Sequence, residues 1–454
     1  MQDATIVLDI GKTNAKLSLI AHDGQTLASA RRANSVLRDG PYPHLDTEGL
    51  WQWMLEVLRA FASQAHVRAI VPVTHGATAA LIDEQGLVLP VLDYESALPE
   101  EAEPDYGAAC DPFQCTYSPR LPAGLNLGRQ LFWLARRFPQ EFKRARHILM
   151  YPQYWAWRLC GVAASEVTSL GCHTDLWLPL EQQLAPLVHK QGWQSRFPTL
   201  HKAADTLGPL LPSVAAATGL PADCGVVCGI HDSNASLLRH LLAPERSLPA
   251  VLSTGTWVIV AAFDVPLARL DERRDMLANV DAFGNPVACM RFMGGREFAA
   301  LAGPQPQTCS ADDIARLIAR GSYALPCFAE AGGPFAGQAG RQIGPAPANA
   351  AEAYALATLY VALMSDYCLD CLGVQAPLVI EGSFTTNPYF APLLAALHPA
   401  QPVLVSDDTS GTTSGGLMLH LGAAGAARAE QAAAPWQDPM WPVYRARWRA
   451  LLTS

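Results

Sequence analysis

Hydrophobic and polar positions near the start of the chain predict three short strands, a helix and a further strand. The strand candidates are residues 5–9, 16–21, 26–32 and 67–73, the last of them a continuous apolar run. Asp23-Gly24 marks a turn between the second and third strands, and apolar residues recur at helical spacing over residues 47–62. The chain therefore opens as an antiparallel meander followed by a helix and a buried strand.

The middle of the chain alternates between helical and strand-like patterns. Helical spacing runs over residues 128–144, with a break or kink at Pro139, and over residues 151–159, which end at Gly161. Residues 85–125 hold many prolines and indicate a loop or insertion. A strand at 224–229 is followed by a helix at 233–242, which Pro244 ends.

The second half repeats the arrangement of the first. A strand pair at residues 250–263 is interrupted by the polar turn Ser253-Thr254-Gly255-Thr256, and residues 331–350 indicate a surface loop. The later helix and strand candidates are residues 352–372, 377–381, 390–397, 402–405 and 414–421. We therefore expect two α/β domains, residues 1–243 and 244–454, joined near residues 240–250.

Composition excludes several classes of protein. The 454 residues are about three times the usual single-domain length, and 50% are hydrophobic, so disorder is excluded as the main state. A net charge of −9 argues against nucleic-acid and anionic-membrane partners. The absence of an export signal or a spanning apolar run, with eleven scattered cysteines, indicates a cytosolic protein with reduced thiols. The pair Cys368 and Cys371 has zinc or redox spacing, but packing explains it better.

The first turn, residues 9–14, places an acid at a strand end before small residues. Gly11-Lys12-Thr13 looks like part of a Walker A loop, but that loop needs a glycine five positions before Gly11, where Ile6 stands. The backbone N–H groups and the hydroxyl of such a turn can still face phosphate oxygens, and Asp9 could hold hydrated Mg²⁺. An ordinary hairpin turn with a capping aspartate explains the same residues.

Three further segments carry candidate chemistry. Asp232 stands between a strand end and a helix, where a carboxylate can accept the proton of an attacking hydroxyl, although a plain N-cap fits too. His231 alone is more typical of a structural histidine. Backbone approach at Gly382 and Gly415 could admit a purine or its ribose, and turn or helix-cap chemistry explains both equally well.

In this order the motifs resemble those of the FGGY carbohydrate kinases of the actin-like ATPase superfamily, over nearly the whole chain. Residues 9–16 are similar to that family's first phosphate motif, and residues 73–76 to its sugar-side loop. Residues 229–232 are similar to its catalytic-aspartate segment. Residues 253–256 look like its second phosphate motif, and residues 381–383 stand where its adenosine motif is expected.

The resemblance implies an α/β fold of two ribonuclease-H-like domains around a central cleft, with the sugar on the first and ATP on the second. Asp232 would accept the hydroxyl proton, and Asp9 and Asp232 would hold Mg²⁺. The sugar would contact Thr74, His75, Gly76, Asp93, Glu95 and His231. ATP would contact Gly11, Thr13, Asn14, Lys16, Ser253, Thr254, Gly255, Thr256, Gly382, Ser383 and Asn387.

The His231-Asp232 pair is similar to the corresponding pair in the rhamnulose and fuculose kinase branch. This resemblance implies that the substrate is a 6-deoxyketohexose such as L-rhamnulose or L-fuculose, phosphorylated on O1. A pentulose of the xylulose or ribulose type, or a polyol, is the alternative substrate. The alternatives of another class are a nucleotide-sensing, non-kinase ATPase and a catalytically inactive sugar-binding protein. The partner is then a small-molecule sugar, and a homodimer is allowed.

Two positions depart from the pattern of this family. The adenosine motif keeps one glycine of three, Gly382, and Glu95 stands where the family usually has an arginine two positions after Asp93. The second departure predicts that this part of the sugar site is rebuilt.

Overall fold

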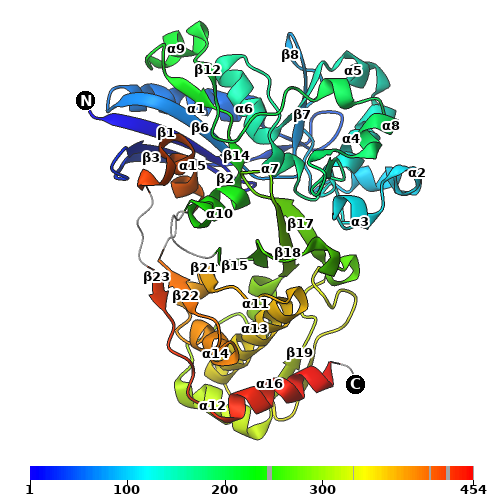
Figure 1. The fold of residues 1–454 in the computed structure, drawn as a ribbon, viewed down its shortest axis with the longest axis vertical. Coiled ribbons are helices and arrows are strands. Elements are labelled where there is room, and N and C mark those ends of the chain that lie inside the picture. Colours follow the sequence, from blue (N-terminus) through cyan, green and yellow to red (C-terminus); the bar gives the residue numbers. More distant parts are fainter. Residues whose placement is uncertain (243–247, 331, 408–410, 426–429, 453–454) are drawn as a thin grey trace. The chain divides into compact units, whose positions relative to one another are not determined.

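The computed structural model describes residues 1–242, 248–330, 332–407, 411–425 and 430–452, which form two compact units (Figure 1). The first unit comprises Met1–Pro244, Ala278–Pro286 and Ser410–Ala427, and the second comprises the rest of the chain. The expected boundary after residue 243 lies outside the described residues and stays a prediction. The two returning segments were not expected from the sequence.

A mixed sheet of seven strands forms the centre of the first unit. Its order is β12-β13-β6-β1-β2-β3, with β14 also paired to β6. The opening meander is confirmed, because β1 to β3 are antiparallel neighbours while β6 runs parallel to β1. The strands are β1 (Asp3–Ile10), β2 (Asn14–Ala21), β3 (Thr26–Ala33), β6 (His66–Thr74), β12 (Thr206–Pro209), β13 (Gly225–Val227) and β14 (Ile230–His231).

The central strand β1 is buried on both faces of the sheet, and its alternate side chains point to opposite faces. Ile6 and Leu8 pack in one core with α1 (Thr47–Ala62) and α6 (Tyr151–Cys160). Val7 packs in another core with α10 (Asp232–Leu241) and α15 (Gly411–Leu421). Figure 1 shows α15 beside α10, although the two helices are far apart in the sequence.

Glycines let α15 approach its neighbours closely. A Cβ atom on Gly415 would lie 1.9 Å from the carbonyl oxygen of Ala235 in α10, and one on Gly416 would lie 2.6 Å from Val7. Helix packing therefore accounts for Gly415 without a bound purine. Part of the polar segment that leads into α15, residues 408–410, lies outside the described residues.

The proline-rich segment 85–125 was expected to be a loop or an insertion; where a loop was expected, several stretches are short helices instead. It contains η1 (Leu98–Ala102), α2 (Glu103–Ala109) and α3 (Phe113–Thr116). Pro99 and Pro104 lie in the first turns of η1 and α2, where the missing N–H of proline costs nothing. The helical pattern around Pro139 divides as expected into α4 (Leu127–Arg137) and α5 (Pro139–Arg144).

The remaining elements of the first unit are short. They are β4 (Val36–Leu37), β5 (His44–Leu45), β7 (Ala79–Asp83), β8 (Gly86–Leu87), β9 (His147–Met150), α7 (Val167–Leu170), β10 (Trp177–Leu178), β11 (Gln183–Leu184), α8 (Pro186–Lys190), η2 (Gln194–Arg196), α9 (Pro212–Thr218) and η6 (Gly422–Gly425).

A second seven-stranded sheet has the order β17-β18-β16-β15-β21-β22-β23; it belongs to the second unit except for residues 278–280 of β17 and Pro286 of β18. The expected strand pair is confirmed as β15 and β16, which are antiparallel, and β15 runs parallel to β21. The strands are β15 (Ala250–Thr254), β16 (Val258–Ala262), β17 (Met276–Val280), β18 (Pro286–Phe292), β21 (Leu378–Gly382), β22 (Val403–Ser406) and β23 (Glu430–Ala432).

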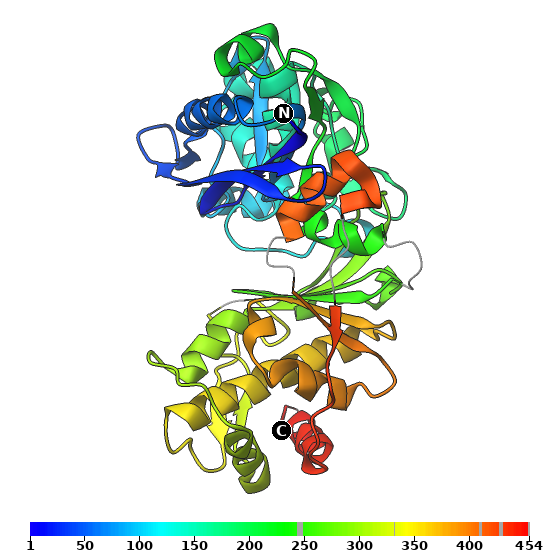
Figure 2. The ribbon, with the colours of Figure 1, turned by 90° about the vertical axis from the view of Figure 1, so that its left-hand side faces the viewer.

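Helices of the second unit gather along one side of these strands (Figure 2). The central helix, α13 (Ala350–Leu372), is long and apolar enough to cross a membrane, but 83% of its most apolar window is buried inside the unit. It is therefore a core helix. The other elements are η3 (Leu267–Arg269), η4 (Glu272–Arg274), α11 (Gly294–Ala302), α12 (Ala311–Arg320), β19 (Tyr323–Leu325), β20 (Arg341–Ile343), η5 (Ser383–Thr386), α14 (Phe390–Leu397) and α16 (Met440–Leu451).

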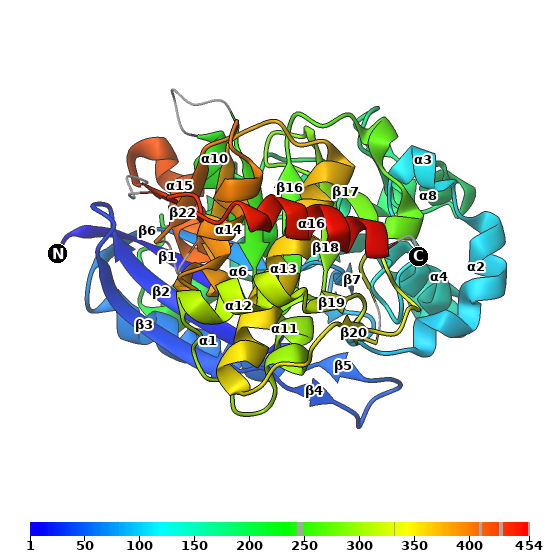
Figure 3. The same ribbon diagram turned by 90° about the horizontal axis from the view of Figure 1, so that it is seen from below.

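Polar contacts join these helices to one another. Figure 3 shows α16 crossing α13 and α14; Trp441 Nε1 donates to the carbonyl of Leu393 at 3.0 Å, and Arg445 Nε donates to Asp366 at 2.8 Å. Cys368, from the CxxC pair of α13, is fully buried. Its burial in the core of the unit is consistent with the expected packing role, which stays a prediction.

Candidate active site

Asp232 is the first residue of α10 and sits where β14 ends. Its Oδ1 atom accepts hydrogen bonds from the backbone N–H of Ser233 at 2.6 Å and from the Ser233 hydroxyl at 3.3 Å, and it lies 3.2 Å from His231 Nε2. Within the described part of the chain, Oδ2 accepts no hydrogen bond, and the side chain is 30% exposed. One oxygen is thus anchored while the other is free to receive a proton.

The imidazole ring of His231 lies next to the carboxylate of Asp232. Asn234 Nδ2 lies 3.3 Å from Nδ1 of the ring, so Nδ1 acts as the acceptor and Nε2 carries the proton that faces Asp232. Burial lowers the pKa of His231, against an opposing effect of Asp232, which favours the neutral ring. His231 therefore orients Asp232, and its expected contact with the sugar stays a prediction.

A buried chain of hydrogen bonds holds the backbone of His231 in place. The backbone N–H of His231 donates to Thr168 Oγ1 at 3.0 Å, and that hydroxyl donates to Glu166 Oε2 at 2.6 Å. Burial raises the pKa of Glu166 to about 7, although hydrogen bonds from Thr168 oppose the shift. The sequence analysis missed Glu166 and Thr168, since only the fold brings them under β14.

Asp9 lies near the end of β1, directly opposite Lys16 on β2. Burial raises its pKa to about 6, with a further contribution from the negative charge of Asp232 and an opposing one from Lys16. The negative charges of Asp9 and Asp232 repel each other. A divalent cation that prefers oxygen ligands would remove this repulsion. The residues present therefore fit Mg²⁺, and Asp9 and Asp232 would hold it.

The expected sugar-side residues Thr74, His75 and Gly76 lie together where β6 ends. Thr74 pairs with His231 of β14, and the ring of His75 packs against Tyr94 and Tyr151 at centroid distances of 5.4 and 5.0 Å. A Cβ atom on Gly76 would lie 2.8 Å from His231 Nε2, so glycine is needed for this close approach. Burial lowers the pKa of His75 and favours its neutral form.

Asp93 and Glu95 are joined to the first turn by Lys12. The Lys12 ammonium group forms an ion pair with Asp93, lies 3.5 Å from Glu95 Oε2 and sits 4.8 Å from the centre of the Tyr94 ring. Asp93 Oδ1 also accepts the backbone N–H of Glu95 at 3.1 Å. The structure thus brings the expected sugar residues together around a lysine that the sequence analysis had not assigned to the sugar.

The turn between β1 and β2 is rigidly braced. Asn34 Nδ2 donates to the carbonyl of Gly11 at 2.7 Å, and the backbone N–H of Asn34 donates to that of Thr13 at 2.8 Å. The Thr13 and Asn14 side chains are exposed. Their contact with phosphate stays a prediction, and the geometry leaves them accessible for it.

The second turn, between β15 and β16, exposes Ser253 and Thr256 but buries Thr254. The Thr254 hydroxyl accepts the backbone N–H of Phe384 at 3.0 Å and is committed to this internal contact. Helix α11 begins beside the turn, since Gly295 N–H donates to the carbonyl of Thr256 at 3.2 Å. The start of this helix carries partial positive charge, and the sequence analysis had not identified the helix; phosphate binding at this turn stays a prediction.

The expected adenosine residues divide into two groups. Gly382 has φ of +85°, and a Cβ there would lie 2.0 Å from the carbonyl oxygen of Thr254, so strand packing requires the glycine. Asn387 is buried, with Nδ2 donating to Thr358 at 2.9 Å and Oδ1 accepting from Tyr389 N–H at 3.0 Å. Both ends of its amide are used internally, whereas Ser383 is exposed.

Comparison with known proteins agrees with this architecture. Residues 247–431 match the family described as carbohydrate kinase FGGY, C-terminal domain. The crystal structure of a carbohydrate kinase from Novosphingobium aromaticivorans superimposes with a TM-score of 0.91 at 38% identity, over 98% of this chain and 100% of that one. The two units are therefore the paired domains of the actin-like ATPase fold. The chain belongs to the FGGY family of carbohydrate kinases.

Curated relatives match over a shorter region. L-fuculokinase of Escherichia coli strain K12 is 28% identical over 277 residues, which is 57% of this chain and 56% of that protein. A probable L-xylulose kinase of Pasteurella multocida is 26% identical over 280 residues, 56% of this chain and 54% of that protein. The chain thus matches only about half the length of these relatives.

Proposed function

We propose that this protein is an ATP-dependent kinase that transfers the γ-phosphoryl group of ATP to a hydroxyl of a ketose. The observation that carries the proposal is the carboxylate of Asp232, anchored through Oδ1, open at Oδ2 and close enough to Asp9 to raise its pKa. A hydroxyl placed at Oδ2 would lose its proton as it attacks phosphorus. Mg²⁺, when bound, supplies charge neutralisation on the transferring phosphoryl group.

Replacement of Asp232 by Asn tests this role. The amide cannot accept the hydroxyl proton, so we expect turnover to fall roughly 10²- to 10⁴-fold while the affinity for sugar changes little. The matched control is Asp264→Asn, which alters an exposed aspartate of the second unit. Turnover of Asp232→Asn near that of the wild type would contradict the assignment.

We propose a 6-deoxyketohexose such as L-rhamnulose or L-fuculose as the substrate, phosphorylated on O1. Similarity to an L-fuculokinase over half the chain supports this choice. Similarity to a probable L-xylulose kinase supports a pentulose as the second candidate. An ADP-release assay over deoxyketohexoses, pentuloses and polyols decides between them, because the preferred substrate gives the highest kcat/KM.

The same assay tests the two classes that lack sugar phosphorylation. A non-kinase ATPase would release ADP at the same rate with and without sugar, and an inactive sugar-binding protein would bind ATP and sugar without transfer. We further propose a cytoplasmic location, which the odd number of cysteines, eleven, scattered along the chain supports.

A further inference from the structure

The sequence motif around Lys12 and the contacts of its side chain suggest different ligands for this residue. Its backbone belongs to the turn Gly11-Lys12-Thr13, which is expected to face phosphate. Its side chain instead turns toward residues 93–95, and the ammonium group contacts Asp93, Glu95 and the face of the Tyr94 ring.

These contacts engage the ammonium group fully. The Lys12 side chain is 17% exposed and that of Asp93 is 8% exposed, so this ion pair is largely shielded from solvent. The lysine stem, His75 and Tyr151 line a cavity of about 10 Å³, which has room for one water molecule at most. If Lys12 moved away to meet a phosphate, the buried carboxylate of Asp93 would lose its cation, which is costly.

We infer that Lys12 is a positioning residue of the sugar subsite rather than a phosphate ligand. It holds the Asp93 carboxylate and the 93–95 loop in place, so that Asp93 presents its remaining acceptor sites to sugar hydroxyls. The inference rests on the proposed function, since it takes Asp93 to be a sugar contact. It also explains why Glu95 can stand where the family usually has an arginine, because Lys12 supplies the positive charge of this subsite.

Substitutions at residue 12 test the inference through separate constants for the two substrates. Lys12→Met keeps the stem and removes the charge, and we expect the KM and the calorimetric Kd of the sugar to rise roughly 10- to 100-fold. The KM for ATP should change less than about twofold, since the lysine is no phosphate ligand. Lys12→Arg should recover part of the loss, and Lys143→Met, an exposed lysine of α5, is the matched control.

The opposite pattern of sugar and ATP constants would overturn the inference. A large rise in the KM for ATP with an unchanged sugar constant would make Lys12 a phosphate ligand. Thermal unfolding of each variant separates these effects from loss of the fold, and the Arg variant keeps the test valid if Met unfolds. If the wild type binds sugar but transfers no phosphate, the proposed function fails, and the calorimetric Kd still decides the role of Lys12. If it binds no sugar, both fail.

Discussion

Glu166 shows how a single buried carboxyl group can make stability depend on pH. Its folded pKa of about 7 lies above the ordinary value of 4.5, mainly because of burial. The folded protein therefore holds this proton more tightly than the unfolded chain, so the free energy of unfolding falls as pH rises from about 4.5 to about 7. The contribution is on the order of 2 to 3 kcal/mol.

Glu166→Gln removes this titration while it keeps the shape of the side chain. Urea unfolding at pH 5, 6 and 7.5 should show that the variant gains stability relative to the wild type as pH rises. Other carboxyl groups with raised pKa values, such as Asp175, cancel in that comparison. Glu56→Gln, on the exposed side of α1, is the control. Parallel pH profiles for wild type and Glu166→Gln would contradict the prediction.

At the residue scale, the sequence predicted where the site residues lie better than where their side chains point. Asp9, Thr74, His75 and Asp232 do gather at neighbouring strand ends, as their places at the ends of apolar runs indicated. The direction of Lys12 could not be predicted, because its partner Asp93 lies 81 residues away. Thr254 and Asn387 were expected to contact ATP because their motifs resemble those of the family, and only the fold shows that their polar groups are used inside the second unit.

Among the elements, strong periodicity predicted helices well. Helices α1 and α14 begin and end at the expected residues, 47–62 and 390–397. The sequence analysis missed α12, although Ser310 and Asp313 form a capping box at its start. It treated prolines only as breakers in segment 85–125, whereas proline also begins helices.

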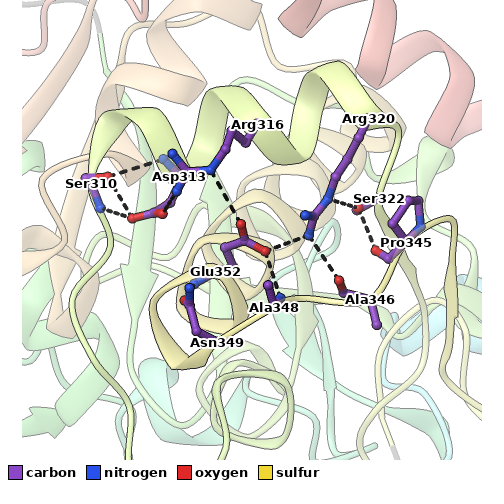
Figure 4. A network of polar contacts seen from close by, with 10 residues as sticks. All are labelled: Ser310, Asp313, Arg316, Arg320, Ser322, Pro345, Ala346, Ala348, Asn349 and Glu352. Atoms are coloured by element: carbon purple, nitrogen blue, oxygen red, sulfur yellow. Dashed lines mark hydrogen bonds and ion pairs between the residues drawn. The ribbon is translucent and has the colours of Figure 1, made fainter.

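A buried glutamate fastens α12 to the start of α13 (Figure 4). Glu352 Oε2 accepts hydrogen bonds from Arg320 at 2.7 Å and from the backbone N–H of Ala348 at 2.8 Å. Its Oε1 lies 3.5 Å from Arg316, which also pairs with Asp313. The single carboxylate thus joins two helices and the loop that precedes α13.

Glu352→Gln should loosen this junction. The amide cannot accept from both arginines and the backbone, and because the arginines are partly exposed we expect a loss of about 1 to 3 kcal/mol in the free energy of unfolding. Chemical denaturation followed by circular dichroism measures it, with Glu272→Gln, an exposed glutamate of the same unit, as control. Equal midpoints for the two variants would argue against the junction.

At the scale of the whole molecule, the chain order and the spatial units do not coincide. The chain leaves the first unit after Pro244 but returns to it for Ala278–Pro286 and Ser410–Ala427. The sequence indicated two halves because motif order is linear. It could not show that α15, near the end of the chain, covers a sheet face built from the beginning.

A fragment of residues 1–243 should therefore not behave as an independent domain. Without α15, the apolar side chains of Val7, Val73 and Leu238 lose part of their cover. We expect the fragment to bind a hydrophobic dye and to associate during size-exclusion chromatography. Joining residues 411–425 through a flexible linker should reduce both effects. A monomeric fragment that binds no dye would contradict this view.

The late position of α15 also sets an order of events during synthesis. Helix α10 ends at Leu241 and α15 begins at Gly411, so about 170 residues are made between them. At about 5 to 20 residues per second, the ribosome needs roughly 10 to 35 s for that stretch. During this time that face of the first sheet lacks the part of its cover that α15 supplies, so we expect correct folding of this protein to depend on how well the face is shielded on the nascent chain until α15 is made.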